Sequence, residues 1–211
     1  MAAQSIDAEV AAIVYDYLIY QLGQKGYQWT SPVELRPPSK VNLTLRSLGD
    51  EFKTRYIDRI TEMCNSLEIE QSSAQETFLG VVNELFSEGV KWARIVAFFV
   101  FGAELAILCK QKDTPQLIDD IAQWITAYIT NHLKIWINEH GGWYVKPLSE
   151  LVELSLEKDG VLQEGLIGFA EGRDPEKKDD NSWPSFKNFV CGVAAGALGA
   201  LTLGAILTSK S

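Results

Sequence analysis

Hydrophobic residues recur at helical spacing along much of the first 140 residues. The clearest case is the segment 41–67, where steps of three and four residues place one apolar stripe on a single helix face. This stripe consists of Val41, Leu45, Leu48, Phe52, Tyr56, Ile60, Met63 and Leu67. The same spacing predicts a helix over 5–24, which ends at Gly23 or Gly26, and three prolines predict a loop over 30–39.

The segment 92–109 has a different pattern, because apolar residues occupy every face and are interrupted mainly by Arg94 and Glu104. A helix that is apolar all round is not a surface helix, so this segment should form the centre of a bundle. Arg94 lies in its first turn, next to Trp92. This lone cation is either paired internally or held for an acidic partner.

Start signals mark two more helices. Ser73 with Glu76 resembles a capping box, and Thr114 followed by Pro115 is typical of an N-cap and first helical position. These two helices are expected over 73–87 and 115–138. Two shorter helices are expected over 143–157 and 160–171. No strand pattern occurs, so the predicted fold is all-α, a helical bundle around a central buried hydrophobic hairpin of two helices.

The segment 189–207 contains nineteen residues without a charge. At helical rise it spans about 28 Å, close to the ~30 Å hydrocarbon core of a bilayer. We expect a C-terminal transmembrane tail helix that anchors the chain after synthesis; the alternative is a buried core helix. Gly192 and Gly196 form a spacing that is typical of paired membrane helices, so a homodimer is left open. The predicted organisation is a helical domain over 1–172, an acidic linker over 173–186 and a tail over 187–211.

Charge and composition exclude several classes of protein. A net charge of −9 argues against a nucleic-acid role, because phosphate binding needs a basic face. Three cysteines, Cys64, Cys109 and Cys191, are an odd number in apolar surroundings, which favours reduced buried thiols. His132 and His140 lack a thiol or acid at ligand spacing between them and are interpreted as polar-face residues. No phosphate loop or nucleophile elbow occurs, so we expect no enzyme, no metal and no cofactor.

Four motifs resemble those of one family. The tract 83–104, NELFSEGVKWARIVAFFVFGAE, resembles the first homology motif of the Bcl (B-cell-lymphoma) family of apoptosis regulators. LRSLGDEF, within 41–56, resembles the third motif, and WINEHGGW, within 128–143, resembles the second. VYDYLIYQLGQKGYQW, within about 10–30, resembles the fourth. The four motifs lie in the family order.

The resemblance implies one of two opposed functions. Pro-survival members capture the amphipathic third-motif helix of pro-apoptotic relatives in a hydrophobic groove, whereas effector members perforate the outer mitochondrial membrane. The string AFFVFG at 97–102, the full fourth motif and the short loop before the third favour the pro-survival type, similar to Bcl-w and Bcl-x-like proteins. The effector is the alternative. The implied location is the mitochondrial outer membrane facing the cytosol, with the cytosol and endoplasmic reticulum also open.

Site residues follow from the resemblance by position. The implied partner groove comprises Phe52, Arg55, Tyr56, Leu85, Lys91, Arg94, Val96 and Phe101. Arg94 is expected to anchor an aspartate of the ligand. The third-motif stripe comprises Val41, Leu45, Leu48, Gly49, Asp50 and Phe52, in which Gly49 permits close approach and Asp50 is able to pair with an arginine. The structural residues of the first and second motifs are Trp92, Gly141, Gly142 and Trp143, where the double glycine lets tryptophans pack at one end of the bundle.

Two positions depart from the family pattern. The family usually has Asn-Trp-Gly-Arg where this chain has Lys91, Trp92, Ala93 and Arg94. Lys91 removes an amide and adds a second cation, and Ala93 adds a methyl group where glycine permits close helix contact. One extra methyl in a packed contact costs on the order of 1–3 kcal/mol. Both changes bear on the range of ligands, which the sequence leaves open.

Overall fold

A computed structural model of the 211-residue chain describes residues 2–32, 34, 36–67, 72–143 and 165–172. Within these ranges every regular element is helical and none is a strand, which confirms the all-α prediction for this part of the chain. Most of the expected helix over 143–157, all of the acidic linker over 173–186 and the tail helix over 189–207 lie outside the described residues.

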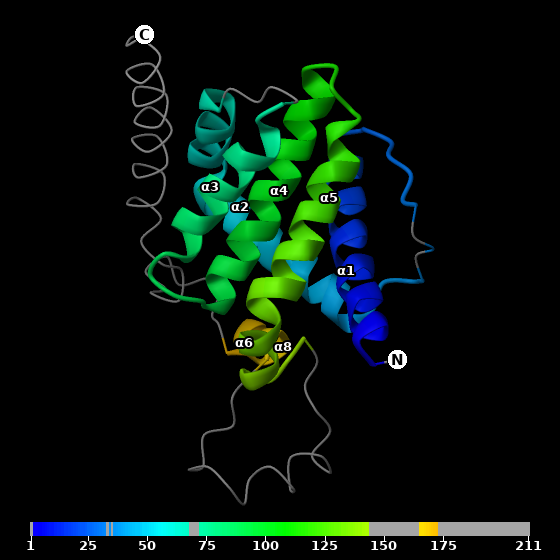
Figure 1. Cartoon of the computed structure of the whole chain (residues 1–211), viewed down its shortest axis with the longest axis vertical. Coiled ribbons are helices and arrows are strands. Elements are labelled where there is room, and N and C mark those ends of the chain that lie inside the picture. Colours follow the sequence, from blue (N-terminus) through cyan, green and yellow to red (C-terminus); the bar gives the residue numbers. More distant parts are fainter. Residues whose placement is uncertain (1, 33, 35, 68–71, 144–164, 173–211) are drawn as a thin grey trace, which may run out of the picture.

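The described elements in chain order are α1 (Ala2–Gln24), α2 (Lys40–Ser66), α3 (Ala74–Phe86), α4 (Trp92–Gln111), α5 (Leu117–Tyr128), a π-helical turn η1 (Ile129–Leu133), α6 (Lys134–Glu139) and α8 (Leu166–Glu171). The central pair, α4 and α5, runs through the middle of the molecule, as Figure 1 shows. Helix α1 contacts both α4 and α5, α2 packs mainly on α4, and α6 and α8 lie at the same end of the molecule.

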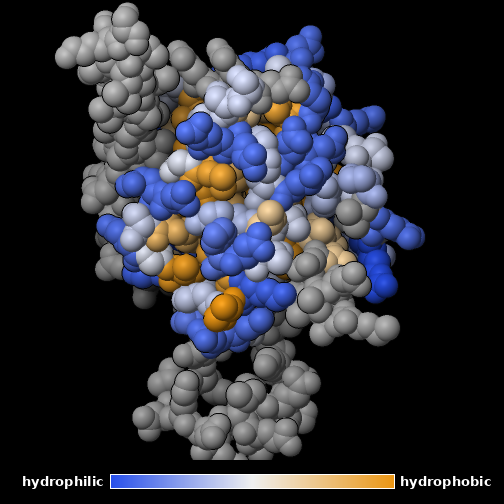
Figure 2. All heavy atoms as spheres, viewed as in Figure 1, coloured by the Kyte–Doolittle hydropathy of each residue, from blue (hydrophilic) through white to orange (hydrophobic). Residues whose placement is uncertain are grey.

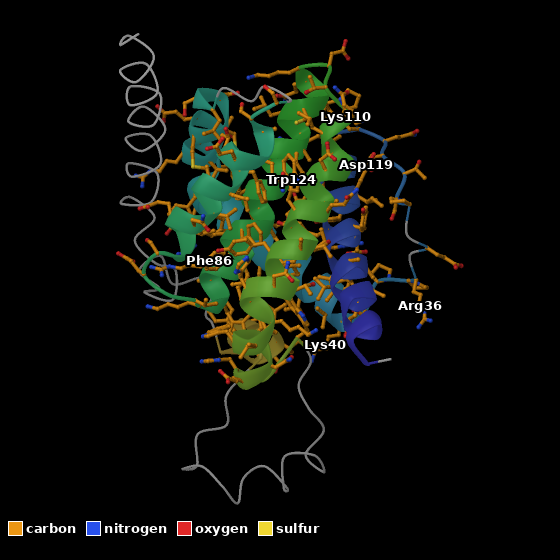
Figure 3. All side chains as sticks on the ribbon, viewed as in Figure 1. Arg36, Lys40, Phe86, Lys110, Asp119 and Trp124 are labelled. Carbon is orange, nitrogen blue, oxygen red and sulfur yellow. The ribbon has the colours of Figure 1, made fainter. Side chains whose placement is uncertain are left out.

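Helix α4 forms the core, as its sequence predicts. Every residue from Trp92 to Cys109 is buried. Among the described residues, α4 alone has the length and composition of a membrane span, yet its apolar window is entirely buried inside the bundle. Aromatic rings of α3, α4 and α5 meet there: the ring centroid of Phe78 in α3 lies 5.6 Å from that of Phe101 in α4 and 5.5 Å from that of Trp124 in α5. Figure 3 labels Phe86 at the end of α3 and Trp124 on α5.

The α4–α5 contact depends on Gly102. A Cβ atom at this position would lie 2.4 Å from Cδ1 of Ile125, which is itself fully buried. We expect Gly102→Ala to lower the free energy of unfolding by about 1–3 kcal/mol. Ile125→Val removes the clashing atom, so the double variant should lose less than the sum of the two single changes. Urea denaturation measures all three variants.

Gly80 provides the matched control for that experiment. It lies exposed in α3, and nothing is within 4 Å of an added Cβ. Gly80→Ala should therefore stabilise the protein by roughly 0.5–1 kcal/mol, because alanine is the better helix former. Equal effects of alanine at positions 80 and 102 would contradict the close packing of α4 on α5.

Two predicted helix starts are wrong in detail. Ser73 precedes α3 with φ −118° and ψ 0°, and its side chain makes no capping hydrogen bond. A capping side chain normally sits on extended backbone, as it does at Ser39, where Ser39 and Asn42 form a capping box at the start of α2. Helix α5 begins at Leu117 rather than Pro115, and the Thr114 hydroxyl faces back to the Cys109 carbonyl oxygen at 3.4 Å.

The double glycine ends α6 as predicted. Gly141 and Gly142 both have positive φ values, 83° and 72°, which glycine adopts without steric cost. The turn brings Trp143 back to Trp92 at 5.8 Å, and Trp136 lies 5.4 Å from the same ring. The predicted packing of tryptophans at one end of the bundle is confirmed.

Sequence reasoning missed how α8 docks on this turn. The Leu166 amide donates a hydrogen bond to the Gly142 carbonyl oxygen at 3.2 Å. A Cβ at Gly165 would lie 2.4 Å from that same oxygen, so the approach requires glycine. A glycine preceding an apolar run was the available signal, but its partner lies more than twenty residues earlier in the chain.

The buried thiols give a prediction on reactivity. Cys64 and Cys109 are buried and free. Burial raises the pKa of the Cys64 thiol far above its usual value, and nearby Glu104 and Cys109 raise it further. We therefore expect native protein at pH 8 to resist iodoacetamide at Cys64, and unfolded protein to react, with labelling read by site-resolved mass spectrometry.

The same shift fixes the direction of a pH dependence. Above pH ~8.5 the unfolded chain loses the thiol proton while the folded chain keeps it, so stability should fall as pH rises. In the iodoacetamide experiment, labelling of Cys64 in the native protein at the rate of the unfolded chain would contradict its burial.

Candidate helix-binding site

The turn between α3 and α4 carries the predicted anchor. Gly89 has φ +95°, and the Arg94 guanidinium folds back over this turn. Its Nη1 donates a hydrogen bond to the Gly89 carbonyl oxygen at 2.6 Å, and its Nη2 pairs with the Glu88 carboxylate. The Arg94 side chain is only 7% exposed, whereas that of Glu88 is 75% exposed. Of the two alternatives left by the sequence, Arg94 is paired internally in this structure.

The other predicted groove residues come from α2, α3 and α4. Phe52, Leu85, Val96 and Phe101 are buried, while Arg55 and Tyr56 are partly exposed. The rings of Phe52 and Tyr56 lie 4.8 Å apart on α2, and Arg55 pairs with Glu51 one turn earlier at 3.3 Å. Lys91 is exposed at the residue before α4. That these residues line a groove stays a prediction.

The third-motif stripe faces the core. Its apolar members and Gly49 are buried: Val41, Leu45, Leu48 and Phe52. A Cβ at Gly49 would lie 2.0 Å from the Tyr17 hydroxyl, so the predicted close approach is confirmed, and its partner is α1.

The hydrogen bonds to Asp50 differ from the expectation. They come from the Tyr20 hydroxyl at 2.5 Å and Gln21 Nε2 at 3.0 Å rather than from an arginine. Arg46, one turn earlier, pairs instead with Asp16 of α1 at 2.6 Å. The physical reason is the rotation of α2, which turns the third-motif aspartate toward the hydroxyl and amide of α1.

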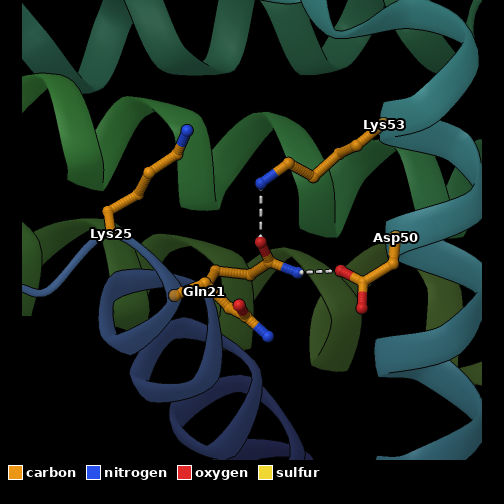
Figure 4. A pocket seen from close by; sticks show the side chains of 5 residues that line it. Gln21, Lys25, Asp50 and Lys53 are labelled. Carbon is orange, nitrogen blue, oxygen red and sulfur yellow. Dashed lines mark hydrogen bonds between the residues drawn. The ribbon is translucent and has the colours of Figure 1, made fainter.

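A buried polar network joins α1, α2 and α4. Lys53 Nζ lies 2.8 Å from Glu104 Oε1 and donates a hydrogen bond to Gln21 Oε1 at 2.7 Å. Figure 4 shows Gln21 lying between Lys53 and Asp50. Burial raises the pKa of Tyr17 well above its usual value, with Asp50 and Glu104 adding to the effect, so the hydroxyl stays protonated.

A polar pocket of about 260 Å³ opens above this network. Its lining consists of Gln21, Gln24, Lys25, Asp50 and Lys53. Since Lys53 and Asp50 already have partners, the network's role is to hold α1 against α2. The sequence signal was Glu104, the one acid in the mostly apolar helix α4. Residue spacing did not show that its partner is Lys53.

The two histidines have local contacts. The His132 ring lies 4.7 Å from Tyr128, and His140 stacks on Trp136 at 3.9 Å. In the described part of the chain, no group of three or more His, Cys, Asp and Glu side chains is placed to hold a metal ion.

Comparison with known proteins decides the family. The family model for apoptosis regulator proteins of the Bcl-2 family matches residues 45–143. The apoptosis regulator Bcl-2 of Gallus gallus is 32% identical over an alignment that covers 94% of this chain and 94% of that protein. The chain belongs to the Bcl-2 family.

Further relatives within the Bcl-2 family agree. Bcl-2-like protein 1 of Rattus norvegicus is 33% identical and covers 62% of this chain and 78% of its own length. The crystal structure of Trichoplax adhaerens trBcl-2L2 bound to trBak BH3 superimposes with a TM-score of 0.59 at 31% identity. It covers 69% of this chain and 96% of that one.

Proposed function

We propose that this chain is a pro-survival regulator that captures the third-motif helix of pro-apoptotic relatives. The observation that carries the proposal is Arg94: a nearly buried guanidinium whose one carboxylate partner among the described residues is the exposed side chain of Glu88. Such a cation suits an acidic residue on an arriving helix. The trBcl-2L2 neighbour supports the mode of binding, because that protein is bound to a BH3 segment.

Capture would combine two physical terms. An amphipathic helix laid in a groove contributes apolar burial, here against residues of α2, α3 and α4. A charge pair in a partly desolvated site adds orientation and discrimination against helices without the acid. The match to proteins named Bcl-2 and Bcl-2-like protein 1 favours the pro-survival type over the pore-forming effector.

The uncharged segment 189–207 supports a location at the outer mitochondrial membrane. The nineteen uncharged residues of 189–207 would hold the helical domain on the outer mitochondrial membrane, facing the cytosol. At that surface, capture of a third-motif helix would restrain permeabilisation directly, because the helix belongs to the membrane-bound effector.

A liposome-release assay tests the function. The full chain added to dye-loaded liposomes should release no dye, and it should block release by a pore-forming effector of the family. Excess trBak BH3 peptide should then restore release, because it competes for the same site. Release by the chain alone would contradict the proposal and favour the effector alternative.

A further inference from the structure

We propose that Glu88 is an internal competitor for Arg94: its carboxylate occupies the guanidinium until the acidic residue of a bound helix replaces it. This inference rests on the proposed capture of an acidic helix. It adds a residue, Glu88, that lowers the affinity of the site for such a helix.

The two partners differ in freedom to move. Arg94 is 7% exposed, lies in the first turn of α4 and is fixed by its hydrogen bond to the Gly89 carbonyl oxygen at 2.6 Å. Glu88 is 75% exposed and lies in the turn after α3. The carboxylate is therefore able to leave without disturbing the core, and the guanidinium is not.

The backbone of the turn sets this arrangement. The Gly89 amide donates to the Phe86 carbonyl oxygen at 2.9 Å, and Gly89 then reverses the chain with φ +95°. No atom lies within 4 Å of an added Cβ at Gly89, so glycine is needed here for its conformation rather than for space. The reversal places the Glu88 carboxylate and the Gly89 carbonyl oxygen on the same guanidinium.

Exchange of one carboxylate for another conserves the ion pair. A ligand acid therefore gains only the difference between its own contact and that of Glu88. A helix that lacks the acid leaves the Glu88 pair in place and gains nothing at Arg94. Glu88 thus lowers the affinity of the site for every helix that carries the acid. It also reduces the difference in affinity between these helices and helices that lack the acid.

Glu88→Gln tests the competitor, with Glu84→Gln as the matched control. Glu84 is exposed one turn earlier on α3, so its replacement makes the same charge change away from the guanidinium contact. The probes are a labelled trBak BH3 peptide and the same peptide with its motif aspartate changed to asparagine. Fluorescence anisotropy with the full chain gives each dissociation constant.

We expect Glu88→Gln to lower the dissociation constant of the unmodified trBak BH3 peptide about three- to tenfold. Glu84→Gln should lower it less. The gain should vanish with the asparagine peptide and in an Arg94→Ala background. A gain in affinity no larger than that of Glu84→Gln, or an equal gain with the asparagine peptide, would show that Glu88 does not compete for Arg94. Neither result would contradict the proposed helix capture. Failure of the parent and every variant to bind overturns the proposed function and this inference with it.

Discussion

Replacing Arg94 with alanine is expected to weaken binding of the trBak BH3 peptide by about 2–5 kcal/mol, which is roughly thirtyfold to a few thousandfold. The change leaves the ligand carboxylate without a partner in a site where the native side chain is 7% exposed. Isothermal titration with the full chain measures the loss, and thermal unfolding shows whether the variant is folded.

Two neighbouring positions serve as controls for Arg94→Ala. Lys91 is exposed, so Lys91→Ala should mainly change the association rate and its salt dependence. Ala93 is buried, and Ala93→Gly should leave affinity unchanged or improve it for bulkier helices. If Arg94→Ala binds as tightly as the parent chain, Arg94 is not the anchor.

Replacing Lys53 with methionine is expected to lower the free energy of unfolding by about 3–5 kcal/mol. The variant leaves the Glu104 carboxylate, 7% exposed on the central helix, without its counter-charge at 2.8 Å. Oε1 of Glu104 accepts no hydrogen bond from the described residues, so the ion pair with Lys53 is its compensation. Urea denaturation measures the loss.

The double variant Lys53→Met with Glu104→Met should recover most of that stability, because apolar residues often replace a buried ion pair at little cost. Lys40→Met gives the exposed comparison: Lys40 pairs with Glu171 at 2.9 Å with both side chains about two-thirds exposed. Its loss should stay within about 1 kcal/mol. A double variant as unstable as Lys53→Met would show that the charges are not coupled.

Local patterns in the sequence predicted the elements well. The run from Trp92 to Cys109 is apolar on every face, and burial follows from that alone. The double glycine likewise determines the turn after α6, since two consecutive positive φ values suit glycine. Each of these signals lies within a single segment.

Contacts between segments were not predictable in the same way. Asp16 and Arg46 are thirty residues apart, and which residue each one faces depends on how α1 and α2 rotate about their axes. Spacing gives the neighbours on one helix, but not the partner on another. The start of α3 shows a related limit, because Ser73 has the right composition for a cap and the wrong backbone conformation.

The sequence drew attention to Arg94 but did not give the partner of its side chain. The first motif left two alternatives for Arg94: a pair with a residue of the same chain, or a cation available to an acidic partner. The position of Glu88, six residues earlier, decides between them only once Gly89 has turned the chain. On the face that Figure 2 shows, apolar side chains lie in several places among hydrophilic ones.

Titration of a labelled trBak BH3 peptide onto the full chain tests helix capture most directly. We predict saturable one-to-one binding, with a dissociation constant below tens of micromolar and weaker binding of the peptide whose motif aspartate is replaced by asparagine. No detectable binding at tens of micromolar, or equal binding of the two peptides, would contradict capture through Arg94.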